Sequence, residues 1–286
     1  MNKKQIVVVV AVVAVMGYLY SLPVKGLVKP KDDSSHRNGV ATGATAVRPV
    51  TQVNVEAISA SAKAAIGPSL AGKIAELEQK LSKAPDANAK TALQKQLAQQ
   101  WDDVNQPAPA GFYYLDLARK DNSFTNWLNA GNRFNDAYKF TQDTLVQPAY
   151  VQNSVESFEH ARKLQPENLD AETGLGIAYV NGGAASPMQG ISLLLDVVKK
   201  DPANRNANIN LGQFAMKSGQ YDKAVARFKT VIAQKAEVEP LFYLAESYKQ
   251  LGMKKEAIAA YERCKDLMPD PAFGQRIDQF IKELKD

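Results

Sequence analysis

The sequence predicts an all-α protein: a solenoid of about four helix pairs with a C-terminal capping helix, preceded by a helical hairpin and an N-terminal transmembrane helix. Two stretches of 22 residues, 211–232 and 244–265, place glycine, alanine and an aromatic residue at the same positions, about 33 residues apart. Helix-ending prolines recur at Pro166, Pro202 and Pro269, spaced by 36 and 67 residues. Apolar stripes with helical spacing lie between these prolines, as expected for stacked amphipathic helices.

Residues 1–30 form the predicted membrane anchor and its flanks. A nearly continuous apolar run covers residues 6–22 after two lysines, which is the low end for crossing ~30 Å of hydrocarbon. A cleaved signal peptide and a buried helix remain alternatives, but the run is long for a signal peptide and no small-residue cleavage site follows it. We therefore expect a single-pass inner-membrane protein whose body lies in the periplasm.

Residues 31–53 are polar and rich in small side chains, which predicts a flexible linker. The region 54–122 follows as a helical hairpin region, with two helices over about 70–105 and an earlier helix expected from about Asn54 to Gly67 and Pro68. Pro85 and Asn88 separate them, and Asp86 can cap the second. The two stripes could pack against the repeats or form a self-association surface, and they consist of Leu70, Ile74, Leu77, Leu81, Leu93, Leu97, Trp101 and Val104.

Residues 123–269 contain the repeated helix pairs. The first helix of each pair carries a small residue where we expect the two helices to cross closely, namely Gly131, Gly176, Gly212 or Ala245. Gly219 and Gly252 are expected at turns with positive φ. Phe228 and Tyr261 are expected to fill the gap to the next unit. In the first unit a longer segment, 135–150, separates the two helices.

Residues 270–286 read as a capping helix that closes the exposed core of the last repeat. Asp270 is a plausible N-cap and Pro271 a first-turn residue. The apolar stripe of this helix consists of Phe273, Ile277, Phe280, Ile281 and Leu284.

Composition and motifs argue against several functions. The net charge of +5 comes from scattered lysines and arginines, so we expect no nucleic-acid binding. Cys264 is the single cysteine and is expected in the core, which leaves no disulfide and no predicted metal site. The segment 174–179 lacks the third glycine of a dinucleotide loop. His160 is expected on a solvent-facing helix side. We predict no catalytic site, no cofactor and no enzymatic activity.

The repeated pattern resembles the tetratricopeptide repeat (TPR) family, whose motif places Trp, Leu-Gly and Tyr in one helix, then Gly, Ala, Phe, Ala and Pro. The resemblance covers about half the chain and is strongest in the last two units. The matching residues are Trp127, Ala130, Gly131, Phe134, Phe158, Ala161 and Pro166; Leu175, Gly176, Tyr179, Gly190, Leu194 and Pro202; Leu211, Gly212, Gly219, Tyr221, Ala224 and Phe228; and Leu244, Ala245, Tyr248, Gly252, Ala257, Tyr261 and Pro269.

The resemblance implies a membrane-anchored bacterial TPR scaffold that binds a protein or peptide in its concave groove. The alternative is a self-assembling structural subunit of an envelope complex that uses the 70–105 hairpin, so a homo-oligomer is possible. Mixed side chains in the groove favour an amphipathic ligand. The repeat register places these groove residues on the first helices: Leu128, Asn132, Asn135, Thr173, Ile177, Val180, Ile209, Gln213, Met216, Phe242, Glu246 and Lys249.

Overall fold

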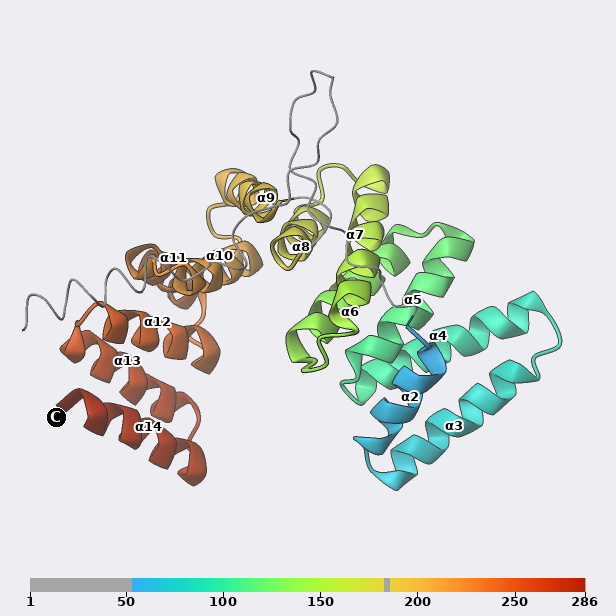
Figure 1. Ribbon diagram of the computed structural model, residues 1–286, viewed down its shortest axis with the longest axis horizontal. Coiled ribbons are helices and arrows are strands. Elements are labelled where there is room, and N and C mark those ends of the chain that lie inside the picture. Colours follow the sequence, from blue (N-terminus) through green and yellow to red (C-terminus); the bar gives the residue numbers. More distant parts are fainter. Residues whose placement is uncertain (1–52, 183–185, 286) are drawn as a thin grey trace, which may run out of the picture. The chain divides into compact units, whose positions relative to one another are not determined.

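A computed structural model describes residues 53–182 and 186–285, which form thirteen α-helices and no strand (Figure 1). The predicted anchor, and the predicted linker up to residue 52, lie outside the described residues. The helices are α2 (Val55–Ala64), α3 (Pro68–Ser82), α4 (Ala87–Asp103), α5 (Pro107–Asp121), α6 (Phe124–Phe140), α7 (Gln147–Leu164), α8 (Leu169–Val180), α9 (Pro187–Lys200), α10 (Arg205–Lys217), α11 (Tyr221–Gln234), α12 (Val238–Gln250), α13 (Lys254–Leu267) and α14 (Pro271–Lys285).

The helices from α6 onward stack as consecutive pairs. Each helix contacts the next along the chain, and α6 also contacts α8, α8 contacts α10, and α10 contacts α12. We therefore define α6–α7, α8–α9, α10–α11 and α12–α13 as the first to fourth pairs, with α6, α8, α10 and α12 as their first helices. This arrangement confirms the predicted all-helical solenoid, in which each unit buries its apolar side against its neighbours.

A small residue on the first helix faces a large one on the second helix within three of the pairs. A Cβ atom added to Gly131 would lie 2.8 Å from the Phe158 ring, and one added to Gly212 would lie 2.7 Å from the Phe228 ring. Gly176 lies against Leu194 in the same way, with a Cβ distance of 2.9 Å. These distances are too short for real carbon contacts, so the predicted close crossings are confirmed.

Phe228 also reaches the next unit, as predicted. Its ring stacks on Tyr243 of the fourth pair with the ring centroids 5.5 Å apart. The side chain of Phe228 is fully buried. The Phe228 ring therefore packs between the two helices of the third pair and also contacts the fourth pair.

The turns within the third and fourth pairs depend on glycine. Gly219 and Gly252 have φ values of 73° and 72°, which confirms the predicted positive φ. Tyr138 stands at the equivalent repeat position of the first pair, where α6 continues to Phe140. The long connection expected over 135–150 is wrong in extent, because helix covers most of it and only residues 141–146 connect α6 to α7.

The hairpin region contains four helices, α2 to α5, one more than the earlier helix and the two-helix hairpin expected there. The additional helix, α5, begins at Pro107, and both Pro107 and Pro109 fall in its first turn, where proline is tolerated. Helices α3 and α4 contact each other, and the Asp86 carboxylate accepts a hydrogen bond from the Ala89 N–H at 2.8 Å, as predicted. Helix α2 packs on α3 and α5.

The predicted single-pass inner-membrane location is contradicted. Within residues 53–182 and 186–285, no helix is both long enough and apolar enough to cross a bilayer. The physical reason is that the longer helices, α6 and α7 among them, are amphipathic and carry polar residues on the sides away from their buried stripe. The apolar run at 6–22, which suggested the span, lies outside the described residues.

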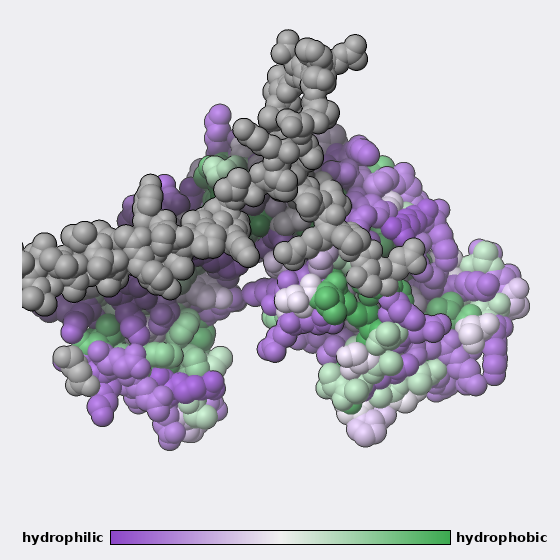
Figure 2. Space-filling model, in the orientation of Figure 1, coloured by the Kyte–Doolittle hydropathy of each residue, from purple (hydrophilic) through white to green (hydrophobic). Residues whose placement is uncertain are grey.

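Helix α14 packs on α13 at the C-terminal end of the array. Ile277, Ile281 and Leu284 are buried there, while the Asp270 carboxylate accepts a hydrogen bond from the Phe273 N–H at 2.7 Å. The predicted N-cap and apolar stripe are therefore both observed. Figure 2 shows the resulting surface as hydrophilic over most of the visible side chains, with smaller hydrophobic patches between them.

Candidate peptide-binding face

The twelve residues predicted to line the groove lie on the four first helices, three on each. We call the side of α6, α8, α10 and α12 that carries them the inner face. Asn132 is the one member of the set that is exposed, and Thr173 is buried. The other ten are half-buried. The stacking of the first helices brings residues far apart in the sequence into neighbouring positions, but their side chains have different surroundings.

Asn135, on the α6 part of the inner face, is engaged in internal hydrogen bonds. Its side-chain amide donates to the Gly174 carbonyl at 3.0 Å, and its Oδ1 accepts from the Ser154 hydroxyl at 2.8 Å. Asn135 therefore ties α6 to both α7 and α8. Leu128 packs against the core of the first pair, so Asn132 is the exposed one of the three predicted residues on this helix.

Helix α8 is apolar around most of its circumference. Ala171, Leu175 and Ala178 are buried in the core, while Ile177 and Val180 lie half-buried on the inner face. A helix at a protein surface normally carries polar residues on its outward side. The inner face of α8 therefore carries apolar side chains that the described residues cover only in part.

Helix α10 adds mixed side chains to this apolar region. Ile209 is half-buried, and Met216 packs against the core of the fourth pair. Gln213 is half-buried. On α12, burial raises the pKa of Tyr243, so its hydroxyl stays protonated at neutral pH and donates a hydrogen bond to Glu239, 3.2 Å away.

The α12 part of the inner face is engaged by the protein's own C-terminal helices. Phe242 packs against Tyr261 and Phe280, with both ring centroids 5.8 Å away. Glu246 accepts a hydrogen bond from the Tyr261 hydroxyl, and burial raises the pKa of that tyrosine.

Lys249 is the third predicted residue of α12, and it interacts with α14. Its Nζ lies 3.0 Å from a Glu283 carboxylate oxygen and 5.5 Å from the centroid of the Phe280 ring. The sequence predicted α14 as a cap but contained no signal that it would also contact Phe242 and Lys249. The predicted inner-face residues of α8 and α10, together with the exposed Asn132 on α6, therefore have the fewest internal bonds.

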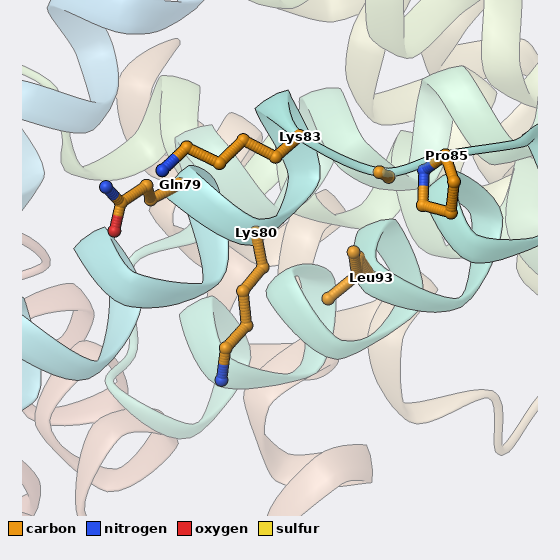
Figure 3. Close-up of a pocket in the computed structure, with 6 residues that line it drawn as sticks. Gln79, Lys80, Lys83, Pro85 and Leu93 are labelled. Atoms are coloured by element: carbon orange, nitrogen blue, oxygen red, sulfur yellow. The ribbon is translucent and has the colours of Figure 1, made fainter.

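Two hollows lie away from the inner face, in the hairpin region. The first, of about 450 Å³, is lined by Gln79, Lys80, Lys83, Ala84, Pro85 and Leu93, between the end of α3 and the start of α4. Figure 3 shows the amine groups of Lys80 and Lys83 pointing in different directions, so they do not converge on one anion. Lys80 also pairs with Glu76 at 2.6 Å.

The second hollow, of about 410 Å³, lies between α2, α3 and Tyr113. Its central carboxylate, Glu78, accepts hydrogen bonds from the Ser59 hydroxyl and the Lys63 amine. The three polar groups satisfy one another and fasten α2 to α3. Neither hollow therefore presents a convergent set of free polar groups of the kind that marks a small-molecule site.

The hairpin stripes pack within the protein. Ile74, Leu97 and Trp101 are fully buried in one cluster with Ala62 and Ala110. Leu70, by contrast, is 41% exposed at the start of α3. Of the two uses that the sequence left open, internal packing therefore accounts for the central residues of both stripes.

The remaining reactive side chains occupy structural positions. His160 is half-buried and stacks on Trp127, with ring centroids 4.3 Å apart, so its expected place on a solvent-facing side is wrong. Cys264 is fully buried, as predicted, and burial raises the pKa of its thiol to about 11. Within residues 53–182 and 186–285, no group of three His, Cys, Asp or Glu side chains is placed as metal ligands would be.

Two stretches of the chain match family models of the tetratricopeptide repeat, at residues 189–241 and 238–271. Among solved structures, a tetratricopeptide repeat protein from Parabacteroides merdae is 14% identical, with 80% of this chain and 88% of that chain covered and a TM-score of 0.52. This similarity shows a shared fold. No curated protein matches the sequence.

Two further solved structures are more distant in shape. YrrB, described as a TPR protein with an unusual peptide-binding site, is 19% identical, with 71% of this chain and 97% of that chain covered and a TM-score of 0.42. A MamA protein is 16% identical, with 64% and 93% covered and a TM-score of 0.45. The family matches show that the chain contains TPR repeats, a structure generally used for binding other proteins rather than for catalysis.

Proposed function

We propose that this protein is an interaction scaffold that binds an amphipathic peptide segment of a partner protein along the inner face of α6, α8 and α10. The observation that carries the proposal is the apolar inner side of α8, where Ile177 and Val180 are half-buried beside the core. The exposed apolar area of these side chains is unfavourable in water. Covering it with a ligand's apolar side chains would contribute about 25 cal/mol of binding free energy per Å².

The neighbouring helices supply polar groups suited to a peptide. Asn132 on α6 and Gln213 on α10 each carry an amide, which has both donors and an acceptor and so matches the peptide backbone. Ile209 and Met216 extend the apolar region onto α10. A ligand with apolar side chains on one side and an accessible backbone would satisfy both kinds of group.

The test uses a peptide of known sequence. Peptides selected on the full-length protein from a random displayed library provide the probe, and calorimetry measures their Kd for variants. Asn132→Arg places a bulky charge at an exposed inner-face position, and Met216→Glu places one in the apolar region. We expect each variant to weaken binding at least about tenfold, the effect of losing ~1.4 kcal/mol.

The matched control is Leu195→Glu, which introduces the same charge on α9 at a position that is 44% exposed. Its Kd should stay within about twofold of the unmodified protein, since α9 is not part of the inner face. The proposal is overturned if the selected peptides bind all three variants equally well, because the binding surface would then lie elsewhere.

The alternative function, self-assembly through the 70–105 hairpin, is less well supported because the central residues of both hairpin stripes are buried within the chain. Leu70 is the exposed apolar residue that could serve it. Light scattering after size exclusion tests this alternative directly. A stable dimer that dissociates in Leu70→Glu would favour it over the peptide-binding scaffold.

A further inference from the structure

One ion pair connects the first and fourth helix pairs directly. The Lys139 Nζ on α6 lies 3.3 Å from a Glu239 carboxylate oxygen on α12. These helices are separated in the array by α8 and α10, which stack between them. The first helices therefore form a closed circuit of contacts, α6 to α8 to α10 to α12, with the ion pair joining its two ends.

Lys139 reaches α12 because α6 is longer than the other first helices. Helices α10 and α12 end at Lys217 and Gln250, and glycines with positive φ follow at Gly219 and Gly252. Tyr138 occupies the same repeat position in α6, and a tyrosine strongly disfavours positive φ. Helix α6 continues to Phe140, past the repeat position at which α10 and α12 end. At a rise of 1.5 Å per residue, Lys139 lies about 5 Å beyond the end that α6 would have if it stopped at that position.

Neighbouring side chains position both partners of the pair. Glu239 accepts a second hydrogen bond from the Tyr243 hydroxyl at 3.2 Å, on the next turn of α12. The Lys139 Nζ lies 5.7 Å from the centroid of the Phe140 ring. Both charged side chains remain about half exposed, at 52% and 53%, so water and salt can reach them.

We propose that the Lys139–Glu239 pair is a clasp that closes the inner face of α8 and α10 and opens to admit a ligand. Exposed ion pairs are weak, and salt screens them, so the clasp opens and closes readily. The admission of a peptide rests on the proposed function, whereas the closure itself does not. The closure can therefore be measured without any ligand.

The measurement is the rate at which a bulky reagent reaches the inner face. Met216→Cys places a thiol on the inner face of α10, and the rate of its modification by a polyethylene-glycol maleimide is divided by its rate with N-ethylmaleimide. The ratio reports access and cancels differences in thiol reactivity. The native thiol stays silent in both reactions because Cys264 is buried and its pKa is raised to about 11.

Charge reversals then open or restore the clasp. Lys139→Glu or Glu239→Lys, each added to Met216→Cys, should raise the ratio roughly two- to fivefold, the range that an exposed ion pair can supply. Reversing both charges together should return the ratio to its starting value. High salt should raise the ratio for Met216→Cys alone. Lys80→Glu, which breaks the similarly exposed Lys80–Glu76 pair on α3, should leave it unchanged.

The clasp is overturned if neither single reversal raises the ratio, or if the double reversal fails to restore it. All three altered side chains, at 139, 239 and 80, are more than half exposed, so the variants should fold normally. If the charge reversals change the rate ratio as expected but the inner-face variants bind the selected peptides normally, the proposed function is refuted and the clasp is not. If the inner-face variants weaken peptide binding but the charge reversals leave the rate ratio unchanged, the clasp is refuted and the proposed function is not.

Discussion

The first and third helix pairs follow the same packing rule with helices of different lengths. Helices α6 and α7 have 17 and 18 residues, whereas α10 and α11 have 13 and 14. In both pairs a glycine of the first helix lies against a phenylalanine of the second. The close crossing of the two helices is therefore the same in both pairs, while the helix lengths differ.

The interiors of the two ends of the array also differ. The first pair contains a buried hydroxyl, Ser154, which bonds to Asn135, and half-buried charges such as Arg133, whose Nε lies 2.6 Å from Asp102. The fourth pair shares an aromatic cluster with α14, in which the ring centroids of Tyr261 and Phe280 stack 5.7 Å apart. Family models match the chain only from residue 189 onward, so the regular part of the array is its C-terminal part.

The largest expected effect tests whether the aromatic residue is equally important in both pairs. Phe158→Ala and Phe228→Ala each remove a fully buried ring and should lower the free energy of unfolding by about 3–5 kcal/mol. Urea unfolding followed by circular dichroism measures both. A loss below ~1 kcal/mol for Phe158→Ala alone would show that the first pair does not share the packing rule.

A smaller effect is expected from the glycines that face these rings. Gly131→Ala and Gly212→Ala add a methyl group 2.8 and 2.7 Å from a ring carbon, so each should cost about 1–3 kcal/mol of unfolding free energy. The matched control is Gly72→Ala in α3, where nothing lies within 4 Å. That change should stabilise the protein by about 0.5–1 kcal/mol, because alanine favours helix.

The stability losses of Gly131→Ala and Gly212→Ala also compare how rigid the first and third pairs are. If the rings are equally rigid, the two losses should agree within about 0.5 kcal/mol. A markedly smaller loss for Gly131→Ala would indicate that the Phe158 ring can move away from α6. The comparison would then show a looser first pair despite its longer helices.

The smallest expected effect concerns the turn that makes the helix lengths differ. Gly252→Ala forces a β-carbon into a turn with φ of 72° and should cost about 1 kcal/mol, even though nothing lies within 4 Å of the added atom. Gly274→Ala, in α14 and also unhindered, serves as its control and should not destabilise. Thermal unfolding of both variants gives the comparison. An unchanged Tm for Gly252→Ala would mean that positive φ is not what ends α12.

The repeated part of the fold could be predicted because its signals are local. Gly219 and Gly252 report the backbone angle at their own positions, and the spacing of apolar residues reports which side of each helix is buried. Helix α5 was not predicted, although it begins with Pro107 and Pro109 in its first turn, a position where proline is tolerated. The membrane location was inferred from residues outside the described structure, and no described helix supports it.

The inner face could be predicted only in part. Its residues follow from the repeat register, but their availability depends on partners far away in the sequence. Asn135 bonds to Gly174, 39 residues later, and Lys249 pairs with Glu283, 34 residues later. No local pattern signals such pairs, because each depends on how neighbouring helices are placed side by side.

The sequence by itself determined the repeat, the helix pairs and the residues that let them cross, because each depends on the shape of one or two side chains. Tertiary structure alone decided which inner-face residues are engaged, that the central residues of the hairpin stripes are buried, and that Lys139 meets Glu239 a hundred positions along the chain. Such contacts depend on the angles and distances between all the successive helices in the stack. A difference of a few residues in one helix, as at Tyr138, changes which distant side chains can touch.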